Sequence, residues 1–241
     1  MKRFINSLFV LAAPLSLCYT CSIAVSEGNK VIVSEEIAIT DYRKIQLSVP
    51  GEMTYHQDIN GKPYLKIDTD ENILPLLEIV ASGDRLQIKT KNNAIIRPSR
   101  LTITTNSAHL DNIDVSGSGQ VHLAGEVQTE RMEINLAGSG GIATDGLYCE
   151  TMRIDVTGSG NAQLNGTCRE ASWSIAGSGN IRAFGCVVER LTCNLAGAGN
   201  MDITAREALT LNLAGSGNAR YKGSPHVTRN ISGSGVIERM D

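Results

Sequence analysis

Apolar and polar residues alternate along the C-terminal half of the chain, around a Gly-x-Gly tripeptide that recurs. Alternation with a period of two is typical of a β-strand that buries one face. Two residues before the first glycine, every copy carries Val, Leu or Ile. These residues form a column: Val115, Leu136, Val156, Ile175, Leu195, Leu213 and Ile231. We expect this column to stack inside the fold, with one side chain per copy.

The tripeptide occurs seven times, at spacings of 18 to 21 residues. Its glycines are Gly117, Gly119, Gly138, Gly140, Gly158, Gly160, Gly177, Gly179, Gly197, Gly199, Gly215, Gly217, Gly233 and Gly235. One copy of this length cannot bury its apolar face, so the copies must stack on one another. The pattern predicts an all-β fold, a single-chain β-solenoid (β-helix) with coils of about 19 residues. We expect the glycines to turn the chain at corners, where a positive φ or close packing excludes a Cβ.

Before the repeats, residues 37–106 lack the tripeptide but keep strand patterns. The expected strands are Tyr42–Val49, Glu52–Gln57, Tyr64–Asp68, Arg85–Thr90 and Leu101–Thr105. Asn60-Gly61 is a hairpin candidate between two of them, and residues 71–80 are a candidate for one short helix. We interpret residues 37–106 as irregular, β-rich N-terminal coils that cover the first edge of the solenoid. Residues 37–240 then form one domain, with the seven repeats in residues 107–240.

A polar column, here called the Asx column, lies three residues before the first glycine of each copy. It consists of Asp114, Asn135, Asp155, Ser174, Asn194, Asn212 and Asn230. The interpretation that we favour is an amide ladder, in which stacked side chains hydrogen-bond to one another. The alternative is a surface that binds a sugar chain or a protein through Asp114, Asn135, Asp155, Asn194, Asn212 and Asn230.

Charged residues also follow the repeat. Four equivalent positions alternate in sign from copy to copy: Arg182, Asp202, Arg220 and Glu238. Glu133 is expected to face Arg153 of the next copy, since opposite charges on neighbouring strands stabilise by roughly 0.2–1 kcal/mol per pair. Further charges at Arg239 and Asp241 are expected to blunt the C-terminal edge.

The N-terminus has the pattern of an export signal. Lys2 and Arg3 precede an apolar run that ends at Leu17 and is too short to span a bilayer. We assign residues 1–24 to a signal peptide and residues 25–36 to a linker.

Two fates of the signal remain open. One is cleavage after Ala24, and the other is a lipoprotein signal, with Cys21 as the better lipidation candidate and Cys18 as the second. The chain is therefore expected to be exported, either as an outer-membrane lipoprotein of the cell envelope or as an extracellular protein. Contact with a membrane is expected only through that lipid.

Four further cysteines occur within the repeats: Cys149, Cys168, Cys186 and Cys193. Cys149 and Cys168 each lie nine residues before a Gly-x-Gly, so they should be neighbours on adjacent coils. An even number of cysteines in an exported chain favours disulfides over a metal site. We predict a Cys149–Cys168 disulfide, with four buried thiols as the alternative, and leave the pairing of Cys186 with Cys193 open.

Composition and charge argue against several functions. A net charge of -3 provides no basic field for a nucleic acid. In the Asx column, Asn135 separates Asp114 from Asp155, so adjacent coils present no pair of carboxylates for acid–base catalysis. The histidines share no column: His56, His109, His122 and His226. We therefore expect no catalytic residues, no cofactor and no metal.

Three motifs carry a resemblance to a known family. They are DRLQIKT at residues 84–90, LTITTNSAHLDNIDVSGSGQV at residues 101–121 and the LAGSGN motif at residues 213–218, which recurs with single substitutions at 136–141, 175–180 and 195–200. Together they resemble the "putative auto-transporter adhesin, head GIN domain" family of exported Bacteroidetes proteins, over about residues 37–240. The resemblance implies β-helical envelope proteins, often lipoproteins, that act in adhesion and have no established catalytic residues.

Two functional hypotheses follow. The first is a non-catalytic adhesion or interaction module that presents a solenoid surface to a surface glycan or protein. The second is a carbohydrate-binding or carbohydrate-active β-helix protein, which clusters of acidic residues on one face would favour. Either is compatible with an oligomer.

Overall fold

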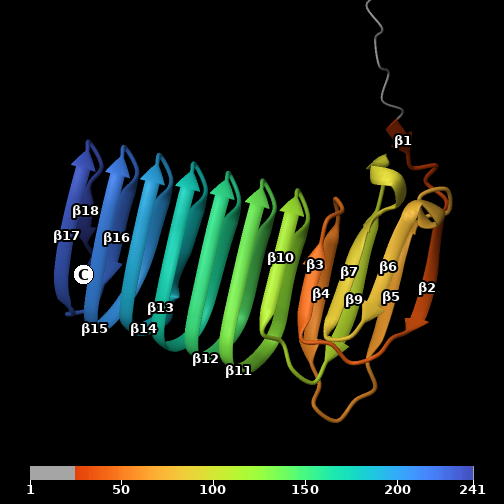
Figure 1. Ribbon diagram of the computed structural model, residues 1–241, viewed down its shortest axis with the longest axis horizontal. Coiled ribbons are helices and arrows are strands. Elements are labelled where there is room, and N and C mark those ends of the chain that lie inside the picture. Colours follow the sequence, from red (N-terminus) through yellow and green to blue (C-terminus); the bar gives the residue numbers. More distant parts are fainter. Residues whose placement is uncertain (1–24, 241) are drawn as a thin grey trace, which may run out of the picture.

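The computed structural model describes residues 25–240. Most of the chain is a β-solenoid, in which parallel strands stack one coil upon the next (Figure 1). The strands of the repeats are β10 (Asn112–Gly117), β11 (Gln120–Gly138), β12 (Gly141–Gly158), β13 (Asn161–Gly177), β14 (Asn180–Gly197), β15 (Asn200–Gly215), β16 (Asn218–Lys222), β17 (His226–Gly233) and β18 (Ile237–Arg239). Neighbouring coils pair in parallel, which confirms the predicted fold class.

The strands pair in the register that the apolar columns predict. Val115 lies beside Leu136, and the pairing continues without a slip to Ile231 in the last coil. Side chains of this column are at most 3% exposed up to Leu213, whereas Ile231 is 49% exposed. Each fully buried aliphatic side chain contributes about 1.5–3 kcal/mol, so this stacking is the main source of stability.

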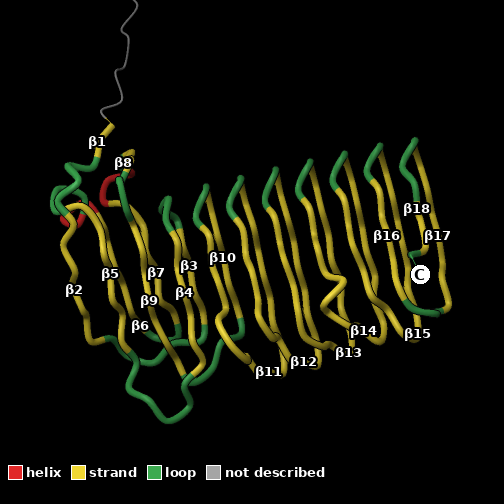
Figure 2. Tube along the Cα trace, turned by 180° about the vertical axis from the view of Figure 1, so that it is seen from behind, coloured by secondary structure: helices red, strands yellow, loops and turns green. Residues whose placement is uncertain are grey.

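The Gly-x-Gly tripeptides lie at one corner of each coil, where their short loops line up in a row (Figure 2). The first glycine of each tripeptide has a positive φ, for example +131° at Gly197. A Cβ on Gly197 would also overlap the carbonyl oxygen of Gly177 in the preceding coil. Conformation and close packing therefore both exclude a side chain at this corner.

The N-terminal region continues the stack and then closes it. Its strands are β1 (Val25–Glu27), β2 (Ile32–Ala38), β3 (Lys44–Leu47), β4 (Glu52–Gln57), β5 (Tyr64–Asp70), β6 (Leu77–Ser82), β7 (Arg85–Thr90), β8 (Ile95–Arg97) and β9 (Leu101–Ser107). β3 pairs in parallel with β10, and β4 pairs in parallel with β11. At the far end the pairing becomes antiparallel, between β2 and β5 and between β6 and β7 (Figure 1). These strands form the N-terminal end of the stack.

The helix expected over residues 71–80 is wrong. Only Leu74–Leu76 form a single 3₁₀ turn, and the chain then enters β6. Pro75 lacks the N–H that a longer helix needs. The following Ile79 and Val80 pair with Ile88 and Gln87 of β7, which gives their backbone groups partners in the sheet.

The hairpin expected at Asn60-Gly61 is also wrong, because β4 and β5 do not pair with each other. Both pair with β9, which lies between them. The tight hairpin is instead at Gly83-Asp84, where Ser82 pairs with Arg85 and Gly83 has a φ of +63°. A two-residue loop needs such a left-handed residue, and Gly83 provides it.

The linker expected over residues 25–36 contains strands. Val25–Glu27 form β1, which pairs in parallel with β8, and β2 begins at Ile32. The exposed edges of β8 and β5 provide backbone partners for this polar segment, so its low hydrophobicity does not prevent pairing.

At the opposite end, β17 and β18 each pair with only one of the described strands. Glu238 and Arg239 are exposed there, as expected. Ile231 and Val236 share this edge and are 49% and 57% exposed. The last coil therefore carries charged side chains, but these do not shield its apolar side chains from solvent.

Candidate functional site

The Asx column runs along the outer surface of one side of the solenoid, and part of it is a hydrogen-bonded ladder. Asn135 Nδ2 donates to Asp114 Oδ1 over 2.8 Å. Asn212 Nδ2 donates to Asn194 Oδ1 over 2.8 Å, and Asn230 Nδ2 donates to Asn212 Oδ1 over 2.7 Å. The stacked amides satisfy one another in the manner of the ladder that we favoured.

The column extends further than the repeats suggest. Gln46 of β3 is the register partner of Asp114, and Gln87 of β7 pairs with Gln46 in turn. Gln87 Nε2 donates to Gln46 Oε1 over 2.8 Å. Asp155 leaves the ladder, because its Oδ2 accepts the Nε–H of Arg153 over 2.7 Å. The ladder is therefore interrupted near the middle of the solenoid.

A shallow groove of about 610 Å³ lies over the C-terminal half of the Asx column. Ser174, Asn194, Asn212 and Asn230 line it, together with the alanines of the next outward column. Asp114, Asn135 and Asp155 lie outside this groove. The structure thus brings three of the six predicted binding residues together in one concavity, which we call the Asx groove.

A second asparagine ladder was missed in the sequence. Asn161, Asn180, Asn200 and Asn218 each follow directly after a Gly-x-Gly and are register partners. The Nδ2 groups of Asn180, Asn200 and Asn218 donate to the Oδ1 of the preceding coil's asparagine over 2.9 to 3.3 Å. The signal was present in the final Asn of the LAGSGN motif. This ladder fixes the coils on the other side of the glycine corner.

The predicted column of alternating charges is present. Arg220 donates two hydrogen bonds to the carboxylate of Asp202 in the preceding coil, from Nε over 2.8 Å and from Nη2 over 3.0 Å. Glu133 is the register partner of Arg153, as expected. Their ion pair does not form, because Arg153 turns to Asp155 on its own strand.

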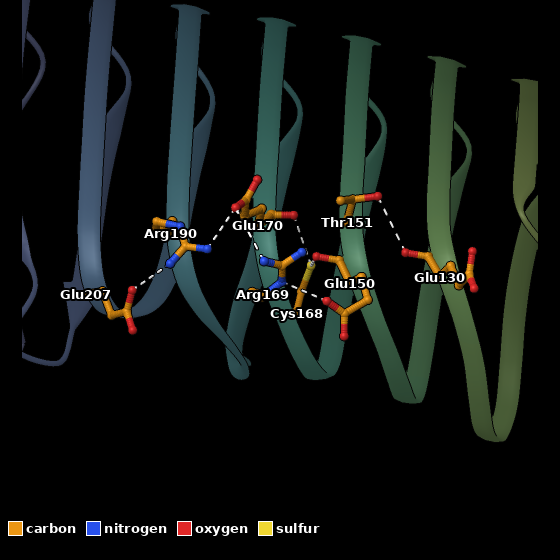
Figure 3. A network of polar contacts seen from close by, with 8 residues as sticks. All are labelled: Glu130, Glu150, Thr151, Cys168, Arg169, Glu170, Arg190 and Glu207. Carbon is orange, nitrogen blue, oxygen red and sulfur yellow. Dashed lines mark hydrogen bonds and ion pairs between the residues drawn. The ribbon is translucent and has the colours of Figure 1, made fainter.

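A larger charged network at the opposite bend of the coils was not foreseen (Figure 3). Arg169 Nε contacts Glu150 Oε2 over 2.7 Å. Arg190 bridges two coils, with Nη2 at 2.7 Å from Glu170 Oε1 and Nη1 at 2.8 Å from Glu207 Oε2. Its residues stand in two regular columns, because Glu150, Arg169 and Glu207 lie eight residues before the first glycine of their copies and Glu170 and Arg190 lie seven before it. The sequence therefore contained a signal for this network that was missed.

The family model described as "Putative auto-transporter adhesin, head GIN domain" matches residues 41–225. The chain belongs to this family. The comparison with curated proteins gave no match.

Solved structures share the fold of this head GIN domain. A putative lipid-binding protein from Parabacteroides distasonis ATCC 8503 is 30% identical, with a TM-score of 0.77, and the match covers 90% of this chain and 100% of that one. A putative adhesin from Bacteroides fragilis NCTC 9343 is 25% identical, with a TM-score of 0.84, over 89% of this chain and 99% of that one. A putative adhesin from Parabacteroides merdae ATCC 43184 is 25% identical, with a TM-score of 0.72, over 90% and 99%. Membership of this adhesin family implies an exported or surface protein.

The predicted disulfide of the head GIN domain is wrong. Cys149 and Cys168 are register partners on β12 and β13, as expected, but both are free thiols. Side chains at paired positions of parallel strands point the same way, so their Cβ atoms stay about 4.8 Å apart. That exceeds the roughly 3.5–4.5 Å typical of a disulfide. Cys168 Sγ instead donates to the carbonyl oxygen of Glu170 over 3.1 Å.

Cys186 and Cys193 are also free, and both are buried. Burial raises the pKa of Cys186 to about 12 and raises that of Cys193 as well. These two residues act as small apolar side chains of the core. The lipidation candidates Cys18 and Cys21 lie outside the described residues.

The candidates for chemistry are scattered in the head GIN domain. His122 Nε2 lies 2.8 Å from Asp145 Oδ1, and Asp145 also accepts the backbone N–H of Gly125, so this pair ties a corner together. Within residues 25–240 there is no group of three or more His, Cys, Asp or Glu residues that could hold a metal ion. In the same part of the chain, no helix is long and apolar enough to cross a bilayer.

Proposed function

We propose that this chain is a non-catalytic adhesion module of the cell surface that holds a glycan or protein partner in the Asx groove. The observation that carries this proposal is the alignment of Ser174, Asn194, Asn212 and Asn230 in one groove. Its volume of about 610 Å³ falls within the range of roughly 300–1,000 Å³ that is common for binding sites. Membership of the adhesin family supports the proposal but does not name the partner.

The ladder gives the groove a rigid floor. Asn212 uses one N–H and its Oδ1 within the ladder, which leaves a second N–H free to face a partner. The neighbouring Ala196 and Ala214 are exposed and too small to obstruct a flat ligand. A partner would therefore meet regularly spaced donors without an entropic cost for ordering them.

The same proposal includes a lipid anchor at Cys21. The first described strand begins at Val25, at the capped end of the solenoid and far from the last coils (Figure 1). A lipid on Cys21 would hold the capped end near the membrane and direct the Asx groove outward. Its test is Cys21→Ser, which should release the protein from the membrane fraction, whereas Cys18→Ser should not.

The adhesion proposal is tested by filling the groove. In Ala196→Arg/Ala214→Arg, two long charged side chains would stand over the floor without entering the core. Ala137→Arg is the matched control, because Ala137 is exposed in the same column but outside the groove. Beads coated with the protein would be measured for attachment to immobilised mucin, fibronectin and collagen. We expect attachment to fall at least tenfold in the groove variant and to persist in the control; equal attachment by both would refute the proposal.

A further inference from the structure

A second groove lies at the opposite bend of the coils, near the N-terminal cap. It measures about 740 Å³, and its lining includes Arg43, His109, Gln128, Glu130, Tyr148 and Glu150. None of these residues belongs to the Asx groove, so the two sites can be perturbed separately. We call this concavity the Tyr148 groove.

Tyr148 distinguishes the groove from the rest of the surface. Aromatic residues make up only 4% of the sequence, and within residues 25–240 Tyr148 is the one whose side chain is exposed, at 37%. Its ring lies against Gly146, where an added Cβ would approach ring carbon Cε2 to 3.2 Å. Because Gly146 has no side chain, the ring of Tyr148 can pack directly against the backbone at Gly146. An exposed ring with a polar hydroxyl can stack on an apolar surface and hydrogen-bond at its rim.

The wall beside this ring is held in place. Gln128 and Thr167 are the register partners of Tyr148 on the two adjacent coils. The side chain of Gln57 clamps the backbone of Gln128, with Nε2 donating to its carbonyl oxygen over 3.0 Å and Oε1 accepting its N–H over 2.7 Å. The backbone around the ring is therefore ordered before any ligand arrives, which lowers the entropic cost of binding.

Unused donors and acceptors line the same groove. Arg43 is fixed by its Nε, which donates to Asp111 Oδ2 over 2.6 Å, and its two Nη groups have no partner among the described residues. The carboxylate of Glu130 likewise has no hydrogen-bond or ion-pair partner within residues 25–240. Glu150, on the neighbouring coil, gives one oxygen to Arg169 (Figure 3). The groove thus offers both N–H donors and carboxylate acceptors.

Charges of both signs occur in and beside the groove, and this limits the class of ligand. Arg43 is paired with Asp111 and Glu150 with Arg169, which leaves the carboxylate of Glu130 as one uncompensated negative charge. A strongly anionic ligand would be repelled by Glu130 and Glu150, and a strongly cationic one by Arg43. Hydroxyl groups can both donate and accept, so a neutral polyol satisfies both walls.

The thiol in the groove does not suggest chemistry. Cys149 lies between Tyr148 and Glu150, and its pKa is raised by a hydrogen bond with Cys168 and by burial. A protonated thiol is a poor nucleophile. The groove therefore favours binding over a covalent reaction.

We propose that the Tyr148 groove binds a neutral sugar residue of a surface glycan, with the ring of Tyr148 stacked on one sugar face and Arg43 and Glu130 bonded to its hydroxyls. This site goes beyond the adhesion proposal, because it does not require the Asx groove. A protein with both sites would contact a glycan near the cap and a second partner near the last coils.

The test is affinity electrophoresis of the full chain through gels that contain laminarin, yeast mannan, galactomannan or xyloglucan. Polygalacturonate and chitosan serve as the anionic and cationic counterparts. We expect retardation by at least one neutral polysaccharide, with at least tenfold weaker binding of both charged ones. Tyr148→Ala should weaken the neutral interaction at least tenfold, and Tyr148→Phe should keep most of it. Phe184→Ala, a change to a partly buried aromatic away from the groove, should bind normally.

Three results would overturn this inference: no retardation by any neutral polysaccharide, equal retardation by the charged ones, or unchanged binding by Tyr148→Ala. Should Tyr148→Ala fail to fold, Glu130→Gln provides the second variant and should weaken binding about three- to tenfold. Bead attachment that is lost in Ala196→Arg/Ala214→Arg but kept in Tyr148→Ala would support adhesion alone. The two proposals therefore fail independently.

Discussion

Asn212 and Asn194 are joined by a hydrogen bond of 2.8 Å between their side-chain amides, one coil apart on paired strands. The same Asn212 accepts from Asn230 of the next coil over 2.7 Å. An amide that both donates and accepts along a stack is part of the scaffold as much as of the surface. The Asx groove therefore has a floor whose shape depends on the stability of the ladder.

Asn212→Ala should destabilise the fold by about 1–2 kcal/mol, because it removes two ladder hydrogen bonds of roughly 0.5–1.5 kcal/mol each at a partly exposed site. Urea unfolding can be followed by the fluorescence of Trp173, which is the only tryptophan and is fully buried. Ser174→Ala is the matched control in the same column, and its stability should change by less than about 0.5 kcal/mol. Equal stability of Asn212→Ala and the wild type would show that the ladder contributes nothing.

Gly197→Ala should be among the most damaging single changes. The backbone there has a φ of +131°, and a Cβ would overlap the carbonyl oxygen of Gly177. Strain at such a φ costs about 1–3 kcal/mol, and the clash must add to it, so we expect a loss of more than about 3 kcal/mol.

Gly83→Ala tests the cost of a positive φ alone, without the steric overlap that an added Cβ meets at Gly197. Gly83 has a φ of +63°, and nothing lies within 4 Å of the position of its Cβ. We expect a loss of about 1–2 kcal/mol, since only the left-handed backbone opposes the side chain. The difference between the two variants in urea unfolding measures the packing of one coil's backbone on the next. Equal losses would mean that close packing at the corner is unimportant.

Acid should weaken the network around Arg190. Hydrogen bonds from Arg190 hold the pKa of Glu170 below its ordinary value of 4.5. A carboxylate with a lowered folded-state pKa adds stability above its unfolded pKa and loses it as the pH falls through the folded value. Urea midpoints should therefore decrease below about pH 4.5, and the decrease should be smaller in Arg190→Gln. An identical acid dependence in the two proteins would exclude a contribution from this network.

The fold could be predicted because every repeat places its apolar residues at the same distance from its glycines, which defines the strand register several times over. Each glycine corner is flanked by an apolar residue two positions away, so the column from Val115 to Ile231 follows from spacing alone. The cap offers no such repetition. Residues near Asn60-Gly61 fit a hairpin locally, but β9, more than 40 residues later in the chain, supplies the strand that separates β4 from β5. Non-local pairing of this kind overrides turn preference.

The candidate sites were predictable only in part, for a related reason. The Asx groove lies on regular strands, where a column in the sequence is a column in space. The repeat side of the Tyr148 groove follows the same rule, because Gln128, Tyr148 and Thr167 each lie ten residues before the first glycine of their copies and are register partners. Arg43, however, comes from the cap, so its place in this groove depends on how the cap packs against the repeats. Sequence periodicity carries no information about such contacts.

The four cysteines of the repeats should remain free thiols that react slowly in the folded protein. Cys168, Cys186 and Cys193 are buried, and a pKa of about 12 at Cys186 leaves almost no thiolate at neutral pH. Alkylation with iodoacetamide at pH 8, followed by mass spectrometry, should label Cys149 first, since it is the least buried of the four. All four should be labelled rapidly in urea without a reducing agent. Dithiothreitol should leave the urea midpoint unchanged, because no covalent link is lost. A lower midpoint after reduction would show that adjacent coils move close enough for Cys149 and Cys168 to bond, against the parallel Cβ geometry described above.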